Sequence, residues 1–110
     1  MTDVCPLEVE GTGTTIDTYV TIEFDMRARK TITLLLRNTG GANGLTYRVD
    51  GYANESGALY YQEVGDSNVA TTTTIKAAIT TRYSKVVLSV KSQVGGNPTT
   101  YAYEAISAVF

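Results

Sequence analysis

Two pairs of carboxylates have the spacing best suited to chemistry. Glu23 and Asp25 lie two residues apart on one face of a predicted strand, and Glu8 and Glu10 form a second pair with the same spacing. Paired carboxylates can hydrolyse a glycosidic bond, or can bind Ca²⁺ when further oxygen ligands join them. Neither pair lies in a calcium-binding loop motif, and a solvent-facing strand explains both. We therefore predict no catalytic residue, metal or cofactor, and a small carboxylate-based hydrolase is the least favoured function.

The single cysteine, Cys5, is poorly placed for catalysis. A nucleophilic cysteine usually needs a neighbouring base such as histidine, and the chain of 110 residues has no histidine. One cysteine can close neither an intrachain disulfide nor a cysteine-cluster zinc site. The alternatives are an inert thiol and a disulfide between chains. We expect no enzymatic activity.

The eight tyrosines are a second feature with possible binding chemistry. Tyrosine is enriched at protein interfaces, and Tyr60 and Tyr61 are adjacent in a predicted edge strand, so we expect them at an interface. A stacking surface for sugars is the competing interpretation, although tryptophan is absent. An extracellular carbohydrate-binding or adhesion module is therefore the first alternative function.

Charge and hydropathy exclude several classes of partner. The formal net charge is −2, which gives no basic surface for nucleic acid. No apolar run approaches the roughly 18 residues that span a bilayer, and the first residues do not resemble a signal peptide. We expect neither a nucleic acid nor a membrane partner, and synthesis in the cytoplasm.

Alternating apolar and polar residues, separated by Gly/Asn/Ser turns, predict about seven strands. The predicted strands cover residues 19–26, 31–38, 45–52, 59–64, 69–79, 84–92 and 99–110. The pattern is typical of an all-β, single-domain antiparallel β-sandwich, either Ig-like or jelly-roll-like. We place the sandwich at 16–110 and expect the strands at 31–38 and 45–52 to form a hairpin. Residues 1–15, with their Gly-Thr-Gly segment, are predicted to be a flexible N-terminal arm.

Apolar residues on faces that should meet solvent indicate where a partner binds. Leu35 lies between Thr33 and Arg37, and Val87 lies among polar residues of another strand. A neighbouring subunit is the simplest cover for both. Leu7 and Val9 are expected to make contacts from the arm.

Residues 32–41 combine an apolar strand with an Asn-Thr-Gly-Gly turn, and residues 45–49 form a strand centred on Tyr47. This layout, in a cysteine-poor and Thr/Tyr/Gly-rich sandwich, resembles small virion accessory proteins of tailed bacteriophages. The resemblance implies a non-enzymatic virion protein that decorates or stabilises a capsid, or joins head and tail components. It also implies a homo-oligomer in contact with other virion or capsid proteins. No functional residue carries over.

Overall fold

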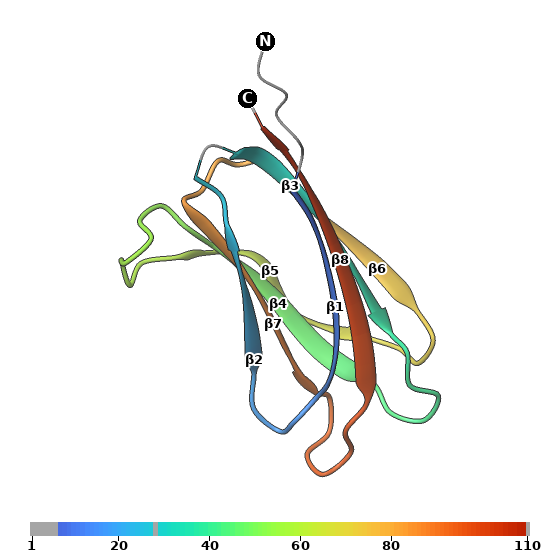
Figure 1. The fold of residues 1–110 in the computed structure, drawn as a ribbon. Helices are drawn as coiled ribbons and strands as arrows, with labels where there is room; N and C mark the ends of the chain where they lie inside the picture. The colour runs from blue at the N-terminus through green and yellow to red at the C-terminus, as the bar shows by residue number, and fades with distance from the viewer. Residues whose placement is uncertain (1–6, 28, 110) are drawn as a thin grey trace.

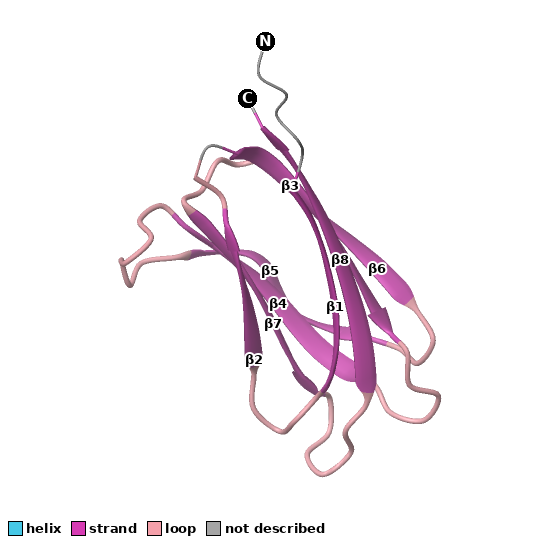
Figure 2. Cartoon of the chain, viewed as in Figure 1, coloured by secondary structure: helices cyan, strands magenta, loops and turns pink. Residues whose placement is uncertain are grey.

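The computed structural model describes residues 7–27 and 29–109, and within them the chain forms strands and loops without a helix (Figure 2). The strands are β1 (Leu7–Thr14), β2 (Val20–Asp25), β3 (Arg29–Asn38), β4 (Leu45–Tyr52), β5 (Tyr61–Val69), β6 (Thr74–Ile79), β7 (Lys85–Ser92) and β8 (Thr100–Val109). The predicted all-β class is confirmed, with eight strands instead of about seven.

The strands form two four-stranded antiparallel sheets that pack against each other (Figure 1). Sheet A has the order β1-β8-β3-β6, and sheet B has the order β2-β7-β4-β5. The antiparallel pairs are nested in the sequence: β1 with β8, β2 with β7, β3 with β6, and β4 with β5. A long hairpin rolled up on itself gives this order, which is that of a jelly roll. The structure therefore decides between the two sandwich types in favour of the jelly roll.

The core lies between the sheets and follows the alternation of the sequence. Leu34 and Leu36 of β3 are at most 1% exposed, and Leu88 and Val90 of β7 belong to the same buried cluster. Full burial of one such side chain contributes about 1.5–3 kcal/mol. The predicted inward phase of both strands is confirmed, and Leu35 consequently lies on the opposite side of sheet A.

Residues 7–14 are not a flexible arm, which corrects the boundary predicted at residue 15. They form β1, an edge strand paired with β8 along its whole length. A Cβ atom at Gly11 or Gly13 would lie 2.5 Å from the hydroxyl oxygen of Tyr103 or Tyr101, respectively. The glycines that suggested a linker instead make room for two tyrosine rings inside the sandwich.

The strands at 31–38 and 45–52 do not form the predicted hairpin. β3 belongs to sheet A and β4 to sheet B, so residues 39–44 cross from one sheet to the other. Glycine and asparagine in this segment indicate a tight turn equally well for a hairpin and for a crossing. The local signal was correct, and the pairing inferred from it was wrong.

Asn38 fixes this crossing with its buried side-chain amide. Its Nδ2 donates to the carbonyl oxygens of Asn43, at 2.9 Å, and Val69, at 3.2 Å. Its Oδ1 accepts hydrogen bonds from the Gly40 N–H, at 3.0 Å, and the Thr99 hydroxyl, at 2.8 Å. One side chain therefore joins the β3–β4 crossing to the end of β5 and to Thr99, the residue before β8.

The boundaries of β5 and β6 also differ from prediction. The turn expected at 65–68 lies inside β5, whose pairing with β4 shifts twice, on either side of Val49. Such irregularities keep an edge strand paired while inserting extra residues. The strand predicted over 69–79 is divided by a turn in which Thr72 has a φ of 55°.

Candidate interaction surfaces

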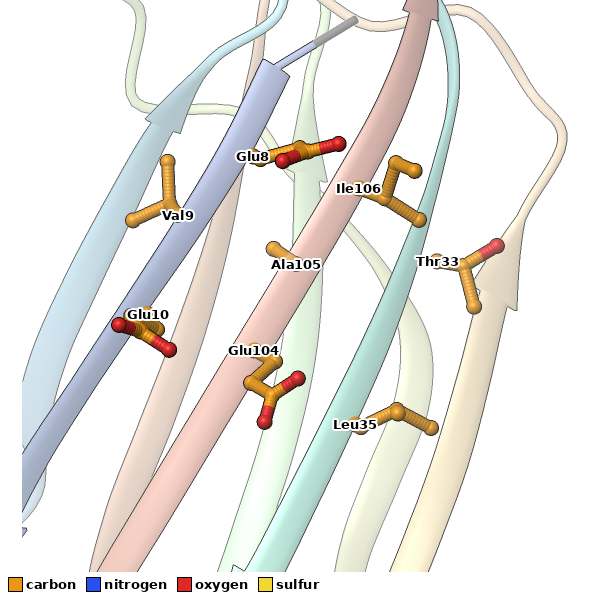
Figure 3. Close-up of a pocket in the computed structure, with 8 residues that line it drawn as sticks. All are labelled: Glu8, Val9, Glu10, Thr33, Leu35, Glu104, Ala105 and Ile106. Carbon is orange, nitrogen blue, oxygen red and sulfur yellow. The ribbon is translucent and has the colours of Figure 1, made fainter.

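Two apolar side chains are exposed at the centre of the outer face of sheet A. Leu35 of β3 is 39% exposed, and Ile106 of β8 is 49% exposed. Ile106 pairs with Thr33, two residues from Leu35 on the same face. Diagonal neighbours of this kind lie about 7–8 Å apart. Leu35 and Ile106 therefore form one apolar patch, which we call the sheet A patch (Figure 3).

Three exposed carboxylates lie beside the sheet A patch. Glu8 and Glu10 of β1 and Glu104 of β8 line an open hollow together with the patch (Figure 3). Glu10 pairs directly with Glu104, and like charges directly opposite on neighbouring strands destabilise a sheet. Within the described residues none of the three carboxylates forms an ion pair. A cationic partner at this face would relieve the repulsion.

The other carboxylate pair, Glu23 and Asp25, neutralises cations of the same chain. Glu23 Oε1 lies 3.2 Å from Lys85 Nζ, and Asp25 Oδ2 lies 2.7 Å from a guanidinium nitrogen of Arg27. In the part of the chain that the structure describes, no group of three or more His, Cys, Asp or Glu residues is arranged to hold a metal ion. The geometry of Glu23 and Asp25 is that of surface ion pairs.

The outer face of sheet B is covered by its own side chains. The Tyr19 hydroxyl donates to Asp66 Oδ1 of β5 at 2.5 Å, so Tyr19 reaches across the face to the far edge strand. The Tyr19 ring centre lies 4.9 Å from Lys91 Nζ and 5.8 Å from the guanidinium carbon of Arg48. Arg48 lies 5.4 Å from the Tyr60 ring as well. These aromatic–cation contacts build a layer over sheet B.

Val87 lies beneath this layer and is only 7% exposed. It pairs with Glu23 of β2 on one side and Asp50 of β4 on the other. Lys85, two residues along β7, bridges from Glu23 to the Tyr52 ring, whose centre is 4.6 Å from Lys85 Nζ. The expected exposure of Val87 is therefore wrong: neighbouring side chains of the same chain cover this face.

Two tyrosines on these surfaces make stability sensitive to high pH. Burial is the main reason why the pKa of Tyr19 and of Tyr83 is raised from 10.0 to about 12. The second reason is a carboxylate that accepts a hydrogen bond from the hydroxyl, Asp66 for Tyr19 and Glu63 for Tyr83. A tyrosine with a raised pKa in the folded state stabilises the fold fully below pH 10, and this contribution is lost as the pH rises through 12. We expect the free energy of unfolding, measured in urea, to fall between pH 10 and 12.

Tyr83→Phe should reduce this fall in stability, because phenylalanine has no proton to lose. The Tyr61 hydroxyl is a smaller cause of the raised Tyr83 pKa, so Tyr61→Phe should reduce the fall less than Tyr83→Phe does. A wild-type stability profile that is flat from pH 10 to 12 would contradict the assignment.

Tyr60 and Tyr61, predicted at an interface, are 51% and 66% exposed. Tyr60 is the last residue of the β4–β5 loop, which protrudes from the sandwich (Figure 1), and Tyr61 begins β5. Tyr60 also packs 5.5 Å from Tyr52, ring centre to ring centre. The neighbouring Leu59, which no pattern in the sequence singled out, is 88% exposed and is the most exposed large apolar residue among those described.

The two N-terminal residues predicted at an interface, Leu7 and Val9, have different outcomes. Val9 points into the sandwich and packs against the core cluster, so its role in β1 is structural. Leu7 begins β1, but its side chain is outside the described part of the structure, as is the whole of Cys5. Ile106 was missed as a surface residue. Its position two residues from Glu104, on the same strand face, was the signal that could have identified it.

Comparison with known proteins shows the fold. No protein-family model matches the chain, and no curated protein matches it. Among solved structures, the Yersinia pseudotuberculosis-derived mitogen is similar with a TM-score of 0.62 and 14% identity, over 93% of this chain and 86% of that chain. The pre-peptidase C-terminal domain of collagenase from Bacillus anthracis has a TM-score of 0.61 and 19% identity, over 90% and 89%.

The Bacillus endospore appendage protein has a TM-score of 0.59 and 15% identity, over 96% of this chain and 88% of that chain. These neighbours are a mitogen, a collagenase domain and an appendage protein, and a fold found in such different proteins does not determine function. Residues 7–27 and 29–109 contain no helix long and apolar enough to cross a membrane.

Proposed function

We propose that this protein is a non-enzymatic structural subunit that assembles with copies of itself. The observation that carries the proposal is the sheet A patch, where Leu35 and Ile106 are exposed beside carboxylates that form no ion pair with any residue the structure describes. Apolar side chains at the centre of a polar rim are typical of protein interfaces. Their burial against a partner contributes about 1.5–3 kcal/mol for each side chain.

The particle that we propose for this subunit is a virion, in which the chain decorates or stabilises a capsid or joins head and tail components. The resemblance of residues 32–49 to virion accessory proteins of tailed bacteriophages supports this part of the proposal. The jelly roll is compatible with assembly, since the endospore appendages of Bacillus, which share it, form pili.

A carbohydrate-binding role is less well supported by the tyrosines. Stacking of a sugar needs a flat aromatic surface, but the Tyr52 and Tyr60 rings are tilted by 39° to each other. Tyr19 is engaged by Arg48 and Lys91. These side chains serve as a cover for sheet B, which favours the structural role.

Leu35→Lys and Ile106→Lys test the proposed assembly. Each variant should fold with a melting temperature close to that of the wild type, because both positions face outward, but should sediment as a single chain where the wild type self-associates. Leu59→Lys changes an exposed leucine of the β4–β5 loop and should leave assembly unchanged. Normal assembly of Leu35→Lys, or a wild-type protein that never associates, would contradict the proposal.

The placement in a virion has its own test. Mass spectrometry should find the chain in purified phage particles, and particles produced with Leu35→Lys in place of the wild type should lack it. Detection of the chain only outside the particles would contradict this part of the proposal.

A further inference from the structure

The outer face of sheet A carries opposite charges on its two halves. Among the side chains that the structure describes, the charged residues of the face are Glu8, Glu10, Glu104, Arg37 and Lys76. The three acids lie on β1 and β8, whereas Arg37 lies on β3 and Lys76 on β6. All five are exposed, and among the described residues none of them forms an ion pair.

One row of register partners shows this division most clearly. Glu10 pairs with Glu104, Glu104 pairs with Leu35, and Leu35 pairs with Lys76. Neighbouring strands lie about 4.8 Å apart, so Glu10 and Lys76 at the two ends of the row are separated by about 14 Å. That separation exceeds the screening length of about 8–10 Å at physiological ionic strength. Glu10 and Lys76 therefore do not neutralise each other within one chain.

We propose that two copies pack sheet A against sheet A about a two-fold axis that runs parallel to the strands, between β8 and β3. This inference rests on the proposed function and names the partner as a second copy of the chain. The axis places β1 over β6 of the second copy, so Glu10 meets Lys76 of the second copy. The symmetry produces the same contact a second time, because a two-fold interface uses the same patch on both subunits.

The same axis also accounts for the apolar patch and the hollow. It places β3 of one copy over β8 of the other, so Leu35 lies above the hollow that is lined by Glu104 and Ile106. Arg37, two residues from Leu35 on β3, comes close to Glu104 of the second copy. Both apolar residues of each copy are covered at the centre of the interface, and the two Glu10–Lys76 pairs lie at its rim, the usual arrangement in protein interfaces.

Charge selects this axis over the other face-to-face arrangement. A two-fold axis in the interface plane but perpendicular to the strands would place β1 over β1. The acidic strands β1 and β8 would then lie over β1 and β8 of the second copy, and the opposed carboxylates would disfavour association. Sheets that pack in alignment keep their strand directions within about 30°, so long glutamate and lysine side chains remain within reach in the favoured arrangement.

Reversing the charges at the two ends of the row, Glu10 and Lys76, tests the proposed two-fold arrangement. Glu10→Lys and Lys76→Glu should each raise the dissociation constant of the dimer at least tenfold, because each places like charges opposite one another twice. An equimolar mixture of the two variants should associate as tightly as the wild type. In the mixed pair one Glu10–Lys76 contact is native, and the other has both charges reversed.

Sedimentation velocity on the full chain measures the association of the wild type, of each single variant and of the mixture. Gln62→Lys adds a positive charge to an exposed position of β5 in sheet B and should leave dimerisation unchanged. Single variants that dimerise normally, or a mixture that remains monomeric, would overturn the two-fold arrangement. If Leu35→Lys prevents assembly while Glu10→Lys does not, the face is an interface with another geometry, so this inference fails and the proposed function stands.

Discussion

Replacement of Asn38 by leucine is expected to cost about 3 kcal/mol or more of unfolding free energy, because several buried polar groups lose their partner at once. The carbonyl oxygen of Val69, the N–H of Gly40 and the Thr99 hydroxyl all bond to the Asn38 side chain. Asn38 itself is fully buried, so water cannot replace it. The melting temperature should fall by roughly 15 °C, at about 4–8 °C per kcal/mol for a domain near this size.

Calorimetry or thermal denaturation followed by circular dichroism measures this loss. Asn97→Leu makes the same exchange at an exposed position of the β7–β8 loop and should change the melting temperature little. Equal effects of the two substitutions would show that the Asn38 hydrogen bonds contribute no more than a surface residue does.

Gly13→Ala should destabilise the fold by about 1–3 kcal/mol, the usual cost of overpacking a core. The new methyl group would lie 2.5 Å from the hydroxyl oxygen of Tyr101, which is itself only 5% exposed and has little room to move. The direction of this effect is informative, since an alanine that replaces glycine without strain stabilises a protein by about 0.4–1 kcal/mol.

Gly41→Ala is the matched control, because nothing lies within 4 Å of a Cβ at that position. It should leave stability unchanged or slightly higher in urea denaturation. Combining Gly13→Ala with Tyr101→Leu should cost less than the two changes separately, since the smaller side chain removes the clash. Strictly additive costs would show that the Tyr101 ring does not need the space at Gly13.

The alternation of apolar and polar residues predicted the strands and their inward faces, because every second side chain of a half-buried strand points into the core. β3 is the clearest case, with Leu34 and Leu36 inside and Leu35 outside. Pairing was less predictable, since β3 is joined to β4 by a glycine-rich turn and yet pairs with β6 and β8. Which strands meet depends on the packing of both sheets, and a turn signal does not contain that information.

The candidate site could be predicted only in part for the same reason. Leu35 was identified from its own strand, but its neighbours Ile106 and Glu104 come from the far end of the chain. Val87 has the same sequence pattern as Leu35 and a different environment. Tyr19 and Tyr52 from elsewhere in the chain, together with Lys85 and Lys91 of the same strand, build the layer above it, and the sequence of one strand does not reveal such a cover.

The nested pairing of the strands also determines when each part of the sandwich can form during synthesis. β4 and β5 are neighbours in both sequence and space, so they can pair as soon as both have been made. The pairs that enclose them join ever more distant segments, and non-local pairing slows folding. β1 and β8 form the outermost of the nested pairs, with Leu7 opposite Ser107. On the ribosome the first strand must therefore wait, with its backbone unpaired, until the last strand has emerged.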